Sequence, residues 1–92
     1  MKNHKLLKFE ANWCAPCKYM APIVENVLSD NVYSDLRLIC INIDDESSQE
    51  AIQQFGIRSI PTLILLDDND QIINKLIGSA NAEQIKEFLS KQ

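Results

Sequence analysis

Cys14 and Cys17 are the two side chains whose type and spacing best suit covalent chemistry. A thiolate, and not a thiol, attacks disulfides and binds metals. The pair lies where an alternating apolar pattern changes to a helical one, and the free amides and dipole at the start of a helix favour negative charge. We therefore expect Cys14, at the helix N-cap, to be an exposed nucleophile with a lowered pKa. Cys17 lies one turn later, within reach of a disulfide, and we expect it to be the shielded thiol that resolves a mixed disulfide.

The elements that must hold this pair follow from the spacing of apolar residues. Residues 6–11 alternate between apolar and polar side chains, which predicts a strand. Beyond Cys14 the apolar residues recur at helical spacing to about Ser29, which predicts one long helix. Pro16 suits its first turn, where no N–H is needed, and Pro22 should bend the helix without ending it.

The rest of the chain predicts three more strands and two more helices. The strands are expected at residues 36–43, 62–66 and 71–77. Ser47 is expected to cap a short helix in a capping box, and Gly56 to end it in a left-handed conformation. Asn81 should cap the last helix, and Asn69 should take positive φ in the turn between the last two strands.

The predicted order is strand, helix, strand, helix, strand, strand, helix. A long helix between the first two strands requires a parallel, right-handed crossover. The last two strands should form a hairpin that extends the same sheet. We therefore expect an α/β fold whose four-stranded mixed sheet has the order 2-1-3-4. The first and third helices should cover one face and the second helix the other, in a single domain spanning residues 1–92.

Composition excludes several classes of protein. Nine basic and thirteen acidic residues give a net charge of −4, which argues against nucleic-acid binding and against a polybasic membrane anchor. The longest apolar run, residues 63–66, is far shorter than the ~20 residues of a membrane span. The N-terminus lacks the apolar stretch of about 7–15 residues that marks a secretory signal. We therefore expect a cytoplasmic protein with no membrane partner.

The cysteine pair has other interpretations. Half of a zinc or iron–sulfur site is one, but structural zinc normally needs four ligands, and the chain offers three cysteines and His4. We therefore expect no metal, although a cluster shared between two chains remains an alternative. An odd number of cysteines also argues against a disulfide framework. We expect the third, Cys40, to be a small buried hydrophobe, with regulatory oxidation as the alternative.

Two segments carry a resemblance to a known family. Residues 13–18, Trp-Cys-Ala-Pro-Cys-Lys, and residues 55–63, Phe-Gly-Ile-Arg-Ser-Ile-Pro-Thr-Leu, resemble the signature segments of thioredoxins. Pro22, Gly78 and residues 84–89 resemble further family positions in the same order. The match covers nearly the whole chain but not the family's usual first strand and helix, so the sequence is similar to shortened thioredoxins. The resemblance implies a thioredoxin-like fold and a protein-disulfide reductase that needs no cofactor beyond a redox-active Cys14–Cys17 disulfide.

The resemblance also implies a substrate site. It implies a cis peptide between Ile60 and Pro61 beside the thiols, which leaves the Ile60 backbone free to pair with an extended substrate. The shallow groove around Cys14 would be lined by Trp13, Ala15, Pro16, Ile60, Pro61, Gly78 and Ser79.

The expected partners are protein disulfides and a separate electron donor, since the chain has no nucleotide-binding motif. That donor would be a thioredoxin-reductase-like flavoprotein or a glutathione-based system, and we expect the chain to act as a monomer. The alternatives are a glutathione-linked, glutaredoxin-like enzyme and a redox-inert binding subunit built on the same fold.

Four residues depart from the family pattern. Ala15 replaces the usual glycine, and Glu10 stands where an aromatic residue is common. Lys8 takes the place of a buried aspartate that assists proton transfer at the resolving thiol, and Cys40 that of its neighbouring lysine. We hypothesise that Lys8 lies beneath the dithiol. As a cation it would lower thiolate pKa and make the protein more oxidising, and as a neutral amine it could act as a base. Alternatively, Lys8 buries its stem and extends its ammonium group to water.

Overall fold

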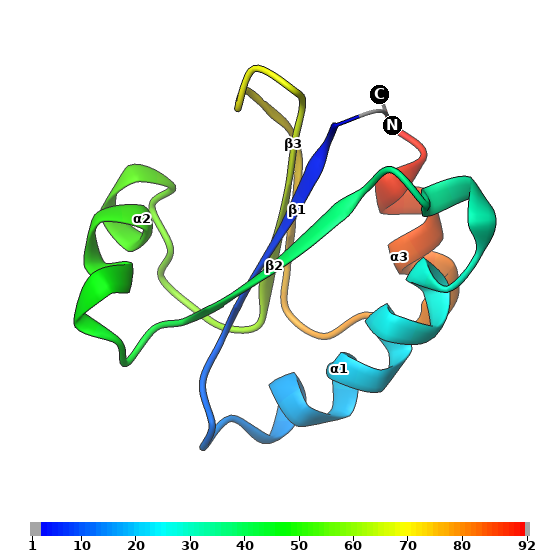
Figure 1. The fold of residues 1–92 in the computed structure, drawn as a ribbon. Coiled ribbons are helices and arrows are strands. Elements are labelled where there is room, and N and C mark those ends of the chain that lie inside the picture. Colours follow the sequence, from blue (N-terminus) through cyan, green and yellow to red (C-terminus); the bar gives the residue numbers. More distant parts are fainter. Residues whose placement is uncertain (1–2, 92) are drawn as a thin grey trace.

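The element order of the computed structural model, which describes residues 3–91, is the predicted one (Figure 1). Its strands are β1 (Lys5–Glu10), β2 (Arg37–Asn42), β3 (Thr62–Leu66) and β4 (Ile72–Ile77). Its helices are α1 (Ala15–Leu28), α2 (Gln49–Gln54) and α3 (Ala82–Leu89), with 3₁₀ turns at Asn31–Tyr33 and Glu46–Ser48. Pro22 lies inside α1, which continues beyond it as predicted.

The four strands form one mixed sheet in the order β2-β1-β3-β4, which confirms the predicted topology. β1 pairs with β2 in parallel and with β3 in antiparallel orientation, and β4 pairs antiparallel with β3. Figure 1 shows α2 on one side of the sheet and α1 and α3 on the other. The strand that leads into the cysteine pair is therefore central, because β1 has a neighbour on each side.

The alternation of β1 divides the core into two clusters. Leu6 packs on the α1 and α3 side with Met20 and Ile85, and Phe9 packs on the α2 side, where its ring lies edge-on to that of Phe55 at 6.2 Å. Side chains two apart on a strand share a face. Lys8 therefore lies on the same face as Leu6, under α1.

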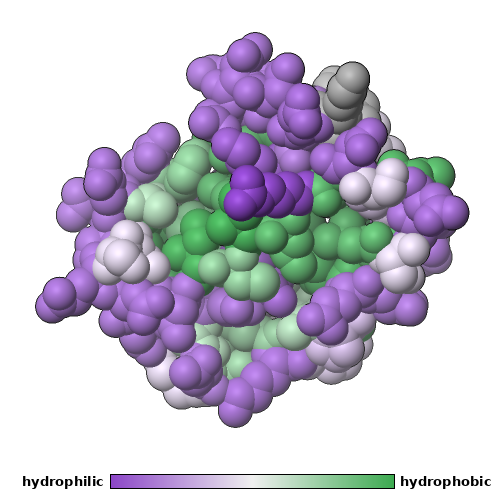
Figure 2. Space-filling model, in the orientation of Figure 1, coloured by the Kyte–Doolittle hydropathy of each residue, from purple (hydrophilic) through white to green (hydrophobic). Residues whose placement is uncertain are grey.

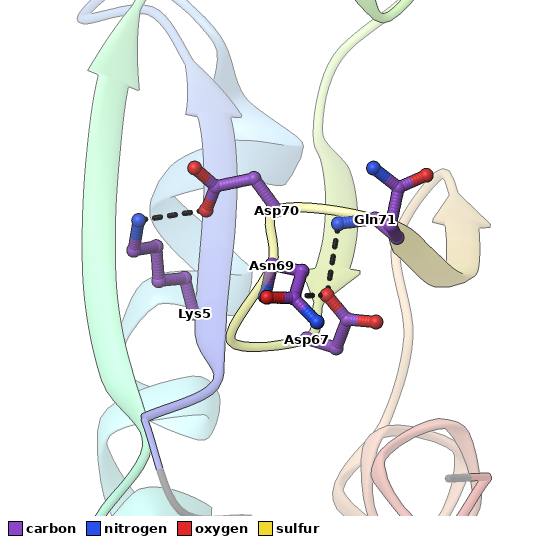
Figure 3. Close-up of polar contacts among 5 residues, drawn as sticks. All are labelled: Lys5, Asp67, Asn69, Asp70 and Gln71. Carbon is purple, nitrogen blue, oxygen red and sulfur yellow. Dashed lines mark hydrogen bonds and ion pairs between the residues drawn. The ribbon is translucent and has the colours of Figure 1, made fainter.

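Two local expectations are wrong. Ser47 does not cap a helix, because a 3₁₀ turn occupies Glu46–Ser48 and α2 begins only at Gln49, with no side-chain cap bond. Positive φ falls on Asp70 (63°) and not on Asn69. The reason is that the Asp67 carboxylate accepts the backbone N–H groups of Asn69 and Gln71, at 2.8 and 2.9 Å, and the loop wraps around it (Figure 3).

Two other predicted ends are confirmed. Gly56, which follows α2, has φ of 61°. The backbone N–H groups of Gly56 and Ile57 donate to carbonyls of the last turn of the helix, Gly56 to Gln53 O at 3.3 Å and Ile57 to Ile52 O at 3.0 Å. At α3, Asn81 and Gln84 form a reciprocal capping box.

The free edge of β2 explains a further correction, since Cys40 is exposed and not buried. Cys40 pairs in register with Lys8 of β1, but no strand among the described residues covers its other side.

Figure 2 shows apolar side chains across the middle of the face on which β2 lies in Figure 1. None of the helices within residues 3–91 is long and apolar enough to cross a membrane.

Candidate active site

Cys14 and Cys17 are joined by a disulfide at the start of α1, with their Cα atoms 5.2 Å apart. Cys14 is the N-cap, and its Sγ accepts the backbone N–H of Cys17 at 3.2 Å. Pro16 lies in the first turn, where its missing N–H costs no hydrogen bond. The helix end thus directs an amide donor at Cys14 Sγ, the geometry that stabilises a thiolate.

Cys14 is less accessible than expected in this disulfide form. Both cysteines are 4% exposed, and both pack with Ala11 against Ile43 and Ile60. The expectation of an exposed Cys14 is therefore wrong for the oxidised state. The reason is that the apolar residues which line the site also cover the sulfurs.

The loop before β3 and the end of β4 meet beside the dithiol. The Ile60–Pro61 peptide bond is cis, and Pro61 is buried. Gly78, with φ of 93°, donates its N–H to the Pro61 carbonyl at 2.8 Å. The structure thus brings together residues 60–61 and 78, which are far apart in the sequence, and exposed Ser79 follows directly.

Trp13 extends this region next to Ile43 and Ile60. Its side chain is 66% exposed, and its indole Nε1 donates to Asp44 Oδ2 at 2.8 Å. Beside it lies a pocket of about 390 Å³, lined by Trp13, Ile43, Ile52, Ile57, Arg58, Ser59 and Ile60. The sequence assigned no site role to Asp44 or Arg58, because both belong to loops whose packing no periodic pattern predicts.

Lys8 is buried rather than extended to water. Its side chain is 5% exposed, and its Nζ lies 3.2 Å from Oε1 of Glu10, whose side chain is 28% exposed. The alternative in which the ammonium group reaches solvent is therefore wrong. Because Glu10 balances the charge, Lys8 does not present a lone cation to the dithiol.

The side chains that could hold a metal ion do not form a cluster in the part of the chain that the structure describes. Residues 3–91 contain no group of three or more His, Cys, Asp or Glu side chains arranged to hold a metal ion.

A CxxC disulfide at the N-terminus of a helix, on a mixed sheet of this topology, defines a class of thiol–disulfide oxidoreductases. The sequence model of the thioredoxin family matches residues 1–91. Thioredoxin of Haemophilus influenzae is 36% identical over 86 residues, which cover 94% of this chain and 77% of that protein. Thioredoxin of Bacillus subtilis is 34% identical over 86 residues, or 94% of this chain and 79% of that protein. The chain belongs to the thioredoxin family.

A solved structure supports the same fold. The thioredoxin of Malassezia sympodialis superimposes with a TM-score of 0.82 at 22% identity, over 98% of this chain and 76% of that one. Family membership and the Cys14–Cys17 disulfide together make the protein a thiol–disulfide oxidoreductase. As in the family generally, its substrates are protein disulfides and its electrons come from a reductase.

Proposed function

We propose that the protein reduces protein disulfides, with Cys14 as the nucleophile and Cys17 as the resolving thiol. The observation that carries this assignment is the N-cap position of Cys14, where an amide N–H already points at its sulfur. A thiolate at that position is stabilised by the helix dipole and by the free amides of the first turn. Cys17, inside the helix, has no such environment.

The proposed reaction needs the two sulfurs and no bound cofactor. Cys14 thiolate attacks a substrate disulfide, forms a mixed disulfide and displaces one substrate thiolate. Cys17 then attacks Cys14, which releases the second substrate thiolate and leaves the Cys14–Cys17 disulfide. A reductase returns two electrons and two protons to complete the cycle.

An extended substrate would lie in the groove around the dithiol. Ile60 contacts the cysteine cluster and offers a backbone edge for pairing. In this proposal Trp13, Ala15, Pro16, Pro61, Gly78 and Ser79 would line the rest of the groove. We also propose a cytoplasmic location, because reductase systems keep such thiols reduced there.

The electron donor is tested by insulin reduction, followed as turbidity. We expect turnover with a flavoprotein thioredoxin reductase and NADPH, and little with glutathione and its reductase. Turnover sustained by glutathione alone would instead identify a glutaredoxin-like enzyme. The Cys14→Ser variant should be inactive with either donor, and Cys40→Ser should be as active as the unsubstituted protein. If the Cys14→Ser variant still binds and supports a partner protein as well as the unsubstituted protein does, the result would favour a redox-inert binding subunit.

A further inference from the structure

Cys17 must lose a proton to attack the mixed disulfide, yet the helix end offers it no acceptor. Cys17 is 4% exposed, and its own backbone N–H is directed at Cys14 Sγ at 3.2 Å. The other free groups at a helix N-terminus are also N–H donors. The proton therefore has to leave in another direction.

A pocket on the α1 side of the sheet supplies that direction. It has a volume of about 370 Å³ and is lined by Glu10, Ala11, Asn12, Cys17, Lys18 and Ala21. Glu10 is the only carboxylate among these residues. The volume is many times the roughly 30 Å³ that one water occupies in the liquid, so water can bridge the carboxylate and the thiol. Asn12 and Lys18 are exposed, which connects the pocket to solvent.

The ion pair with Lys8 fixes the position of Glu10. The two residues are two apart on β1 and share a face, and Lys8 Nζ lies 3.2 Å from Glu10 Oε1. A buried ammonium group is costly without a carboxylate partner, so Lys8 holds Glu10 on this face. No partner of Oε2 is found within residues 3–91, which leaves that oxygen free to accept a hydrogen bond from water.

The other titratable groups on this side do not compete for the role. Lys18 and Glu25 of α1 are exposed, and Cys40 of β2 lies beside Lys8 at the sheet edge. β3, on the other side of β1, carries no titratable residue, and the charged residues of α3 are all exposed. Glu10 is thus the half-buried carboxylate that shares a pocket with Cys17.

We propose that Glu10 accepts the proton of Cys17 during resolution, with Lys8 as its positioning residue. The proposal rests on the roles proposed above for the two cysteines. As Cys17 attacks Cys14, its proton passes through pocket water to the Glu10 carboxylate. The Cys17–Cys14 bond forms, the bond from Cys14 to the substrate breaks, and the substrate sulfur leaves with its electron pair as a thiolate. Glu10 then releases the proton to solvent, and during regeneration it returns a proton to Cys17.

An aromatic disulfide whose released thiolate absorbs visible light separates the two steps. We would use reduced protein in a Cys40→Ser background, so that only the dithiol reacts. The first thiolate appears when Cys14 attacks, at a rate proportional to the probe concentration. The second appears when Cys17 resolves the mixed disulfide, at a rate independent of that concentration.

Glu10→Gln should slow the second phase about 100-fold near pH 7, the size of a general-base contribution. The first phase should change by less than about two-fold, because pocket water near Cys17 takes no part in it. The remaining second phase should rise in proportion to hydroxide concentration. A second phase with unchanged rate and pH profile would overturn the proposal.

Further variants separate chemistry from structure. Glu50→Gln makes the same change at an exposed carboxylate of α2 and should leave both phases unchanged. Glu10→Asp retains a carboxylate and should recover part of the rate. Lys8→Met should slow the second phase less than Glu10→Gln and shift its pH profile, and no shift would remove Lys8 from the proposal.

Two remaining outcomes are also decisive. If Glu10→Gln does not fold because Lys8 is left unpaired, the double variant Lys8→Met/Glu10→Gln removes both charges and carries the same prediction. If the protein with Glu10 intact shows no second phase at all, the roles proposed for Cys14 and Cys17 are wrong, irrespective of Glu10.

Discussion

At the scale of single residues, surroundings and not residue type distinguish the three cysteines. Cys14 lies at a helix N-terminus, whereas Cys40 stands on the free edge of β2. Partial burial raises the pKa of the Cys40 thiol; Lys8 acts to lower that pKa, and the carboxylates of Glu10 and Glu25 act to raise it. Cys40 therefore keeps its proton to a higher pH than an ordinary cysteine and should be a poor nucleophile at neutral pH.

Alkylation by iodoacetamide tests the state of Cys40, because the other two cysteines are protected while their disulfide is intact. The raised pKa means less thiolate at a given pH, so the rate should rise at a higher pH than for a cysteine in a short peptide. Glu25→Gln removes a neighbouring negative charge and should speed alkylation, whereas Glu50→Gln on α2 should not. If the rate of Cys40 alkylation reaches half its maximum at the same pH as in the peptide, or at a lower pH, this account of Cys40 is contradicted.

At the scale of elements, the sequence predicts those strands and helices whose limits are determined by apolar periodicity and by capping residues. β3 ends with the apolar run at Leu66 and begins at Thr62, one residue before that run, and α1 follows from a helical stripe that starts at the cysteine pair. The start of α2 could not be predicted, because the turn at Glu46–Ser48 depends on backbone bonds such as Ser48 N–H to Asp45 O at 3.0 Å. The exposure of Cys40 could not be predicted either, because an apolar run is the same in an edge strand as in a central one.

The two residues expected to cap helices, Asn81 and Ser47, lead to different predictions for stability. Asn81→Ala removes the side-chain half of a capping box, the bond that Asn81 Oδ1 accepts from the Gln84 N–H, and should lower the free energy of unfolding by about 1 kcal/mol. Ser47→Ala should change it by less than about 0.5 kcal/mol, because Ser47 is exposed and caps no helix. Urea denaturation of both variants checks this. Equal losses would mean that Ser47 does cap α2 in solution.

At the scale of the whole molecule, the topology brings the site together at one end of the sheet. The loops after β1 and β2, and the loop before β3, meet around the dithiol, and β1 supplies both the ion pair and the lead into Cys14. The crossover rule and the family resemblance predicted this arrangement. The pocket shared by Glu10 and Cys17 was not predicted, because it depends on how α1 packs over the end of β1.

The measurement that tests the central claim most directly is trapping of the mixed disulfide by mass spectrometry. Reduced Cys17→Ser protein is mixed with a disulfide-bonded substrate protein, quenched with acid and digested, and the linked peptides are identified. We predict a stable adduct on Cys14, because the thiol that would resolve it is gone, and no adduct when the same experiment uses Cys14→Ser. Substrate linked mainly to Cys40, or an adduct that forms equally well without Cys14, would contradict the assignment of Cys14 as the nucleophile.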